Sequence, residues 1–332
     1  MPCIFCGTKE NLTDEHLLPA FSGANLTVHN ASCQKCNSQC GDFENTVAAL
    51  TETARHIFEI PNRYGRIPSA PVKVEIQGGA VTVPGRRKPD GDVEVFDFVA
   101  KTKTEDGKNV QEGFFISEES ANKFVERSRA RGEKITEREA PKEVVLLPSS
   151  QQTLDFAFSL EARKMAAKIA LVSLAHLYGT EYALLPQFDA LRRAPFGSSA
   201  SDLPVRIFAN EDFVSDYTRT PRQHSVRAYL SAGMNKGWAL VCLFGGLSYA
   251  VELTRDFKEH DSRSFSLFYD TEKQALFNPI VLYHEQEIIG RVLSPVTVFE
   301  KPEAVDAQWY PIVERYCQQN EIELSRIVLQ AP

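Results

Sequence analysis

Cys3-Ile4-Phe5-Cys6 and Cys33-Gln34-Lys35-Cys36 are two C-x-x-C motifs close to the start of the chain. Each motif directs two thiolates toward one point, and two motifs together supply the tetrahedral set of four sulfur atoms that a structural zinc ion prefers. Five of the seven cysteines lie in the first 40 residues, and we expect no secretory signal, so metal binding in a reducing compartment is favoured over disulfides. We therefore predict a cytoplasmic protein with a structural zinc site formed by Cys3, Cys6, Cys33 and Cys36.

The segment that carries these motifs, residues 1–61, is too short to bury a stable apolar core of its own. A zinc ion bound by four thiolates contributes folding free energy on the order of 10 kcal/mol to such a segment. Cys40 follows Cys36 by about one helical turn and is an alternative ligand, although we favour a role as a small buried apolar side chain. We expect this segment to unfold when the zinc ion is removed.

The residues between and after the two motifs form a second pattern. It consists of Thr13-Asp14-Glu15-His16-Leu17-Leu18-Pro19, then Gly23, then Thr27-Val28-His29-Asn30, and finally Asn37 directly after the second motif. An acidic residue before a histidine, a proline three residues later, and asparagines on both sides of the second C-x-x-C motif resemble the HNH, or ββα-metal, endonucleases of the four-cysteine kind. The resemblance covers residues 1–60 and implies two short strands and a helix that hold a divalent metal ion against the scissile phosphate.

The resemblance also assigns chemical roles to individual residues. His16 matches the general base, which accepts a proton near neutral pH. Glu15 and Asn37 match the ligands of the catalytic metal, and their hard oxygen atoms suit Mg²⁺ or Mn²⁺. Asn30 matches the asparagine that braces the loop and positions the base. The family more often has aspartate before the histidine and often histidine at the last position, so Asp14 is an alternative carboxylate ligand.

These features predict a metal-dependent endonuclease that hydrolyses phosphodiester bonds. The resemblance favours double-stranded DNA as the substrate, with RNA as the alternative. Two other functions stay open: a non-catalytic zinc module that binds nucleic acid or a partner protein, and an antiviral defence effector whose remaining residues bind a small-molecule activator. Homo-oligomer formation also stays open. The number of bound metal ions separates the nuclease from the non-catalytic module, because only the nuclease needs a second, exchangeable divalent ion.

The charge of the chain is distributed unevenly. The 332 residues carry a net charge of -7, which argues against bulk attraction to nucleic acid or to an anionic membrane. Residues 1–60 hold three Lys or Arg against seven Asp or Glu, whereas residues 63–88 hold six Lys or Arg and one Glu. A phosphate-binding role is one explanation for these basic residues, and a solvated sheet face is the other. The basic residues are Arg63, Arg66, Lys73, Arg86, Arg87 and Lys88.

The resemblance implies a zinc-stapled ββα (HNH) module at the N-terminus, and hydrophobic periodicity predicts a larger mixed region after it, so we expect an α+β protein. We expect domain boundaries after residues 61 and 145, giving segments 1–61, 62–145 and 146–332, of which the last two could form one domain. The longest apolar stretch, 238–253, contains Gly245 and Gly246, so it predicts two strands and not a membrane span. The other expected elements are helices over 38–60, 117–131, 154–177 and 306–319, a hairpin over 72–83, a strand near 265–268, and a linker over 141–152.

Overall fold

The computed structural model describes residues 1–76, 79–87, 93–96, 98–99, 103–105, 108–110, 113–115, 118–133, 143–146, 159–200, 203–207, 220–245 and 247–277. The chain forms two compact units, one made of Met1–Ile67 with Gln151–Leu324 and the other of Pro68–Ser150 with Ser325–Pro332. The N-terminal segment therefore shares a unit with the residues after 150, whereas the sequence suggested a module of its own. Helices and strands occur in both units, which confirms the α+β class.

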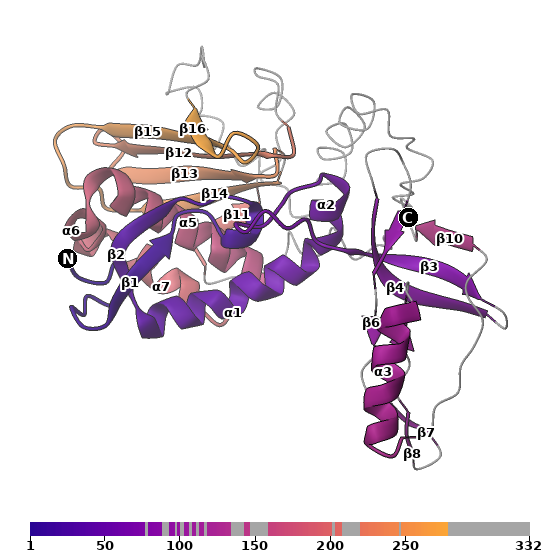
Figure 1. Cartoon of the computed structure of the whole chain (residues 1–332). Helices are drawn as coiled ribbons and strands as arrows, with labels where there is room; N and C mark the ends of the chain where they lie inside the picture. The colour runs from indigo at the N-terminus through magenta and orange to yellow at the C-terminus, as the bar shows by residue number, and fades with distance from the viewer. Residues whose placement is uncertain are drawn as a thin grey trace. The chain divides into compact units, whose positions relative to one another are not determined.

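The first unit begins with a ββα segment (Figure 1). Its elements are β1 (Leu12–His16), the short 3-10 helix η1 (Ala20–Ser22), β2 (Thr27–Cys33) and α1 (Gln34–Leu50). β1 and β2 pair antiparallel, and α1 buries the side chains that recur at helical spacing on one face. These side chains are Cys36, Cys40, Phe43 and Val47. The expected arrangement of two strands and a helix is confirmed.

The helix expected over 38–60 is divided at Thr51 into α1 and α2 (Glu52–Ile57). The buried Thr51 hydroxyl donates to the carbonyl oxygen of Val47 at 2.8 Å, and the Arg55 guanidinium donates to the carbonyl oxygen of Ala48 at 2.9 Å. Both bonds satisfy carbonyl oxygens that the end of a helix leaves unpaired. The prediction of one continuous helix was wrong because apolar periodicity carries on across this break.

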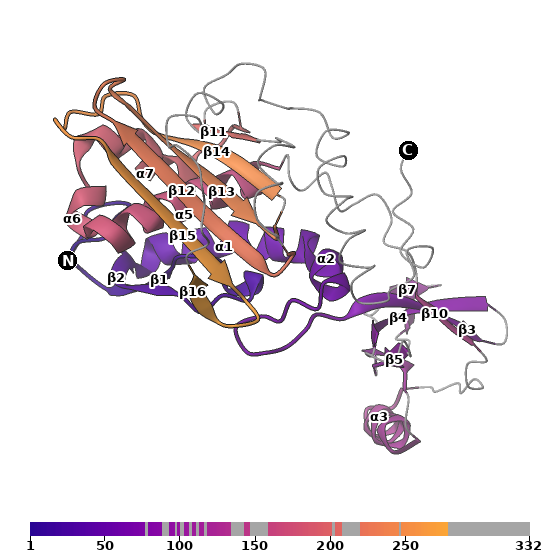
Figure 2. The ribbon, with the colours of Figure 1, turned by 90° about the horizontal axis from the view of Figure 1, so that it is seen from above.

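A long helix and a six-stranded antiparallel sheet form the core of the first unit. The helix is α5 (Leu160–Tyr178), and the sheet has the order β11 (Val205–Ile207), β14 (Leu247–Thr254), β13 (Lys236–Leu243), β12 (Gln223–Ser231), β15 (Arg263–Asp270) and β16 (Ala275–Phe277). α5 contacts the sheet through β14, β11 and β13, and it contacts the ββα segment through α1 and β2 (Figures 1 and 2). Because both sides of α5 are covered, every residue from Met165 to Ala175 is buried.

Hydrogen bonds also join the ββα segment directly to the sheet. The His224 imidazole on β12 bonds to the carbonyl oxygen of Ser22, and the Gln274 amide donates to the carbonyl oxygen of Gly23. The Tyr269 hydroxyl on β15 accepts from the backbone N–H of Asn25 at 3.2 Å. All three bonds reach the turn between β1 and β2, so the sheet fixes this turn in place.

The second unit is richer in strands. Its larger sheet has the order β10 (Glu143–Leu146), β3 (Ala70–Ile76), β4 (Gly79–Arg87) and β5 (Val93–Val95), and the expected hairpin is confirmed as β3 and β4. Two-stranded pairs form between β6 (Phe98–Val99) and β9 (Gly113–Phe114) and between β7 (Lys103–Glu105) and β8 (Lys108–Val110). The helix α3 (Glu118–Ala130) confirms the helix expected over 117–131.

Some further expectations can be compared with the elements. The strands expected within 238–253 and near 265–268 are confirmed as β13, β14 and β15. The linker expected over 141–152 is wrong at Glu143–Leu146, where a short run containing two valines pairs with β3. The helix expected over 306–319 lies outside the described residues. Among the helices that are described, none is both long enough and apolar enough to cross a membrane.

Candidate active site and zinc centre

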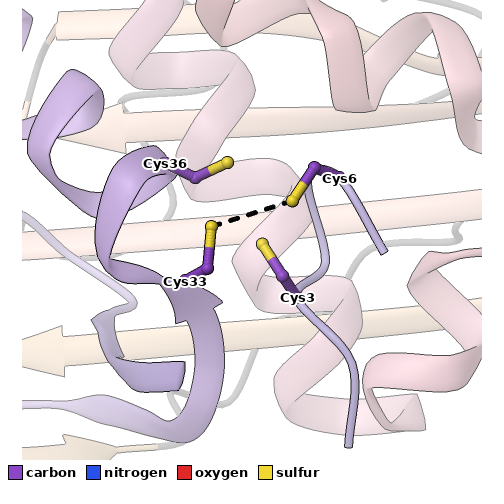
Figure 3. Close-up of side chains that lie close together, drawn as sticks. All are labelled: Cys3, Cys6, Cys33 and Cys36. Carbon is purple, nitrogen blue, oxygen red and sulfur yellow. Dashed lines mark hydrogen bonds between the residues drawn. The ribbon is translucent and has the colours of Figure 1, made fainter. Parts of the chain in front are cut away.

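The four predicted zinc ligands converge on one point (Figure 3). The Sγ atoms of Cys3, Cys6, Cys33 and Cys36 all lie within 4.8 Å of one another, and those of Cys6 and Cys33 are 3.7 Å apart. In a tetrahedral site with Zn–S bonds of about 2.3 Å, neighbouring sulfur atoms are about 3.8 Å apart. The spacing of the thiols and their soft sulfur donors therefore fit a zinc ion, and the four-cysteine cluster supports a structural zinc site.

The local backbone explains why these cysteines meet. Gly7 has a φ of +77°, which lets its N–H bond back to the carbonyl oxygen of Cys3 and closes the first turn. The N–H of Ile4 donates to the carbonyl oxygen of Ala31, which ties this turn to β2. Cys33 is the N-cap residue of α1, so the start of the helix places Cys36 opposite the first pair. The zinc cluster thereby joins the N-terminal turn, β2 and α1.

Cys40, the alternative zinc ligand, lies outside this cluster. Its side chain is buried on α1, where burial raises the pKa of its thiol. It belongs to the apolar face of the helix, as the sequence favoured.

A bulge in the β1–β2 hairpin lies opposite Asp14. The register passes from Thr13 paired with Ser32 to Glu15 paired with Val28, and Asn30 within the bulge has a φ of +50°. The Asp14 carboxylate accepts from the Asn30 backbone N–H at 3.0 Å and lies 2.7 Å from Nδ1 of His29. The hydrogen bond from Asn30 is the main cause of the lowered pKa of Asp14, and the His29 side chain adds to it. Asp14 thus stabilises the bulge.

His16 stands at the end of β1 in a protected position. Its Nε2 lies 2.8 Å from the Arg63 guanidinium, which can only donate, so Nε2 is the unprotonated nitrogen. Its Nδ1 is buried and has no hydrogen-bond partner among the described residues. Burial lowers the pKa of His16, and the positive charges of Lys168 and Arg63 lower it further, against the weaker opposing effect of Glu15 and Asp14. The imidazole is therefore neutral at pH 7 and can accept a proton at Nε2.

Asn37 lies in the first turns of α1 and contacts β1. Its Nδ2 donates to Oγ1 of Thr13 at 2.9 Å and to the carbonyl oxygen of Asp14 at 3.3 Å. Both bonds use Nδ2, and Oδ1 makes no hydrogen bond with any described residue. The side chain of Asn30, by contrast, lies 2.8 Å from Nε2 of His29, and the structure shows no bond from it to His16 within the described residues.

Glu15 points into the protein, and its exposed fraction is only 1%. Its Oε1 lies 2.6 Å from the ammonium of Lys168 on α5, and the same ammonium lies 2.5 Å from Oε1 of Glu44 on α1. The second oxygen of Glu15, Oε2, is buried without a hydrogen-bond partner in the described part of the chain. The sequence did not identify Lys168 as a site residue, because Arg163, Lys164 and Lys168 lie close together on one helix and such a cluster is typical of a solvated face.

The sequence of the ββα segment matches a known protein family. Residues 3–49 match the family model of the HNH endonucleases. The matched range contains both C-x-x-C motifs, the hairpin and nearly all of α1, so the resemblance expected from the motif is confirmed for this segment and supports nuclease activity. The comparison with curated proteins found no match, and neither did the comparison with solved structures.

The donor atoms of the HNH segment can be compared with the needs of a catalytic Mg²⁺ or Mn²⁺. Glu15 and Asn37 each have one polar atom held by the protein and one oxygen left over. This is the arrangement in which neighbouring groups orient the ligands of a metal. A magnesium ion is commonly held by one or two protein oxygens together with water and substrate phosphate. The side-chain oxygens of Glu15 and Asn37 are chemically of the kind that a hard divalent cation prefers.

Arg63, one of the predicted basic residues, reaches the HNH site through its contact with His16. It is exposed, follows Pro61 closely, and its backbone N–H donates to the carbonyl oxygen of Ala20 at 3.2 Å. Arg66 lies in the same turn, which the Asn62 side chain closes by accepting from the backbone N–H groups of Tyr64 and Arg66. For Lys73, Arg86 and Arg87 the structure describes only the backbone of β3 and β4, and Lys88 lies outside the described residues.

A surface pocket of about 500 Å³ adjoins the HNH site on the side of Arg63. Besides Arg63, its lining includes Asn62, Glu59, Arg222, Glu272 and Gln274. Within this lining, Arg222 lies 3.2 Å from a carboxylate oxygen of Glu59 and 3.6 Å from one of Glu272, so its charge is balanced locally. Arg63 thus stands between a pocket with balanced charges and the imidazole of His16.

Proposed function

We propose that the protein is a metal-dependent endonuclease in which His16 is the general base. The observation that carries this proposal is the state of His16: a neutral imidazole with its unprotonated Nε2 beside an exposed arginine, at the end of an HNH strand. A general base must be unprotonated at the working pH and within hydrogen-bonding reach of its target. A nearby cationic side chain suits a substrate that is a phosphodiester anion.

Each residue of the proposed site has its own role in phosphodiester hydrolysis. His16 takes a proton from the attacking water through Nε2, which becomes free when the Arg63 guanidinium moves onto a phosphate oxygen. Asn37 and Glu15 would hold the divalent cation through their side-chain oxygens, and Asp14 with Asn30 keeps the bulge that fixes the β1 strand. A bound Mg²⁺ or Mn²⁺ supplies positive charge at the phosphoryl oxygens and the leaving oxygen.

Double-stranded DNA is the substrate that we propose, with RNA as the alternative. The HNH match supports nucleic acid in general. The net charge of -7 implies that nonspecific attraction to nucleic acid is weak, so binding depends on local contacts such as Arg63 and on the metal ion. The adjoining pocket has room for part of a nucleotide next to the phosphate that Arg63 contacts.

A nuclease assay on purified full-length protein tests this proposal. Wild type is incubated with plasmid DNA and with single-stranded and double-stranded RNA, each with Mg²⁺ or Mn²⁺. We expect cleavage by wild type and a loss of at least about 100-fold in rate for His16→Ala. The matched control is His29→Ala, which removes an exposed imidazole from the neighbouring strand and should retain cleavage. Equal rates for wild type and His16→Ala with every metal and substrate would contradict the assignment.

A non-catalytic zinc module that binds nucleic acid is the second candidate. The observation that favours it is the contact between Lys168 and Glu15, which occupies one oxygen of the proposed metal ligand. Metal analysis separates the two candidates, because the nuclease binds an exchangeable divalent ion in addition to zinc. One zinc ion per chain, with no Mn²⁺ binding in the presence of nucleic acid, would favour the binding module.

A further inference from the structure

A buried lysine connects the HNH segment to the core helix of the first unit. Lys168 has an exposed fraction of 0%, and its ammonium contacts Glu15 on β1 and Glu44 on α1. Two carboxylates within 2.6 Å of a buried ammonium form the ion-pair arrangement that keeps the ammonium protonated. Lys168 is therefore charged, although an isolated ammonium would be very costly at this position.

The cluster contains more negative than positive charge. It has two carboxylates and one ammonium, and the only other titratable group close to it on these helices is the Cys40 thiol, whose pKa is raised by burial. Oε2 of Glu15 completes no hydrogen bond with any described residue, and the one ammonium is shared between Oε1 of Glu15 and Oε1 of Glu44. The excess negative charge is therefore concentrated on buried carboxylate oxygens, which a second cation would stabilise.

We propose that Lys168 sets how tightly Glu15 binds the divalent cation, by neutralising the Glu15 carboxylate when no cation is bound and competing with the cation for it. This proposal rests on the assignment of Glu15 as a metal ligand in the proposed function. A divalent ion that approaches Oε2 meets a carboxylate already paired at Oε1 and is repelled by the ammonium nearby. Lys168 therefore weakens metal binding to the chain alone.

The same charges favour metal binding together with substrate. Two carboxylates, one ammonium, one divalent cation and one phosphodiester carry no net charge as a group, whereas the group without the phosphodiester is positive. Closely spaced charges in a poorly solvated site interact strongly, so the phosphodiester should strengthen metal binding. Lys168 thus makes the binding of metal and of nucleic acid cooperative.

Mn²⁺ binding to the zinc-loaded full chain, measured by electron paramagnetic resonance of free Mn²⁺ without nucleic acid, tests this role. The double variant Lys168→Met with Glu44→Gln removes the ammonium and keeps one net negative charge in the cluster, and we expect it to bind Mn²⁺ about tenfold more tightly than wild type. The single variant Glu44→Gln leaves the ammonium to Glu15 alone, and we expect about tenfold weaker binding. Lys164→Met, on the same helix, is the control and should bind as wild type does.

The outcomes are distinct. Unchanged or weaker Mn²⁺ binding by the double variant would overturn the proposal, and so would tighter binding by Glu44→Gln. A lysine with only a structural role would change stability, but it would not make the double variant bind Mn²⁺ more tightly and Glu44→Gln bind it less tightly. If the double variant lacks its zinc ion or a cooperative unfolding transition, the Glu44→Gln result decides alone. A wild-type chain that shows the expected Mn²⁺ affinities but cleaves no nucleic acid would contradict the nuclease activity and leave the role of Lys168 intact.

Discussion

Nε2 of His224 on β12 lies 3.1 Å from the carbonyl oxygen of Ser22, which is 202 residues earlier in the chain. Nδ1 of the same ring accepts the backbone N–H of Phe244 at 3.2 Å, so Nε2 carries the hydrogen and the ring is neutral. The ring is fully buried, and burial lowers its pKa to about 4, against the opposing effects of Ser22 and Asp270. Protonation at Nδ1 would break the bond to Phe244 and place a charge between the sheet and the HNH turn.

Stability should fall in acid because of His224. The unfolded chain binds the proton near pH 6.5 and the folded chain only near pH 4, so folding is opposed as the pH falls between these values. Once the pH is below both values, the free energy of unfolding is about 3 kcal/mol lower than at neutral pH. Urea unfolding at pH 7 and at pH 4.5 measures this, and His224→Gln should show a smaller difference between the two pH values than wild type. The exposed His260→Gln serves as the control, and equal pH dependence in all three proteins would contradict the prediction.

Removal of zinc should unfold the HNH segment. Four thiolates hold the N-terminal turn, β2 and α1 together, and Cys36→Ser removes one of them. We expect one zinc ion per chain in wild type, substoichiometric zinc in Cys36→Ser, and loss of the segment's protection from proteolysis after treatment with a strong chelator. Cys40→Ala is the matched control because Cys40 lies on the same helix outside the cluster, and loss of zinc from this variant would indicate a different ligand set.

The sequence predicted the HNH segment well because its constraints are local. The spacing of the C-x-x-C motifs and the position of His16 just before Leu17-Leu18-Pro19 depend on short-range geometry. The partners of these residues could not be predicted in the same way. Lys168 contacts Glu15 across more than 150 residues of sequence, and a lysine among polar neighbours on a helix is typical of a solvated face.

The strands that the sequence missed follow the same principle. Glu143–Leu146 was assigned to a linker because four residues carry little periodicity, and only pairing with β3 makes them a strand. β12 was missed because it is buried on both faces at Val226–Ala228, so its pattern does not alternate. Local patterns therefore predicted the four-cysteine cluster and the candidate base His16, whereas long-range contacts determine how the rest of the described chain surrounds them.

Replacement of Arg63 should change both the pH profile and substrate binding. The positive charge of Arg63 is one of the causes that lower the pKa of His16, so Arg63→Gln should raise this pKa and move the acid side of the rate profile to higher pH. KM for nucleic acid should also rise, since a phosphate contact is lost. The pH dependence of kcat/KM measures the first effect. Arg66→Gln is the control: it removes an exposed cation from the same turn, so it should change binding without moving the profile.

Gly23→Ala should destabilise the protein far more than Gly65→Ala. Both glycines have positive φ, +87° and +75°, so alanine at either position costs about 1–2 kcal/mol of backbone strain. At Gly23 a Cβ would also lie 2.7 Å from the carbonyl oxygen of Pro61 and 3.3 Å from Thr271, whereas the space around Gly65 is open. Relief of that overlap requires the HNH turn to move away from Pro61 and from Thr271, which directly follows β15, at an additional cost of about 1–3 kcal/mol. Urea unfolding of both variants measures the difference, and equal losses would show that the turn is free to shift, so that the sheet does not hold the HNH segment in place.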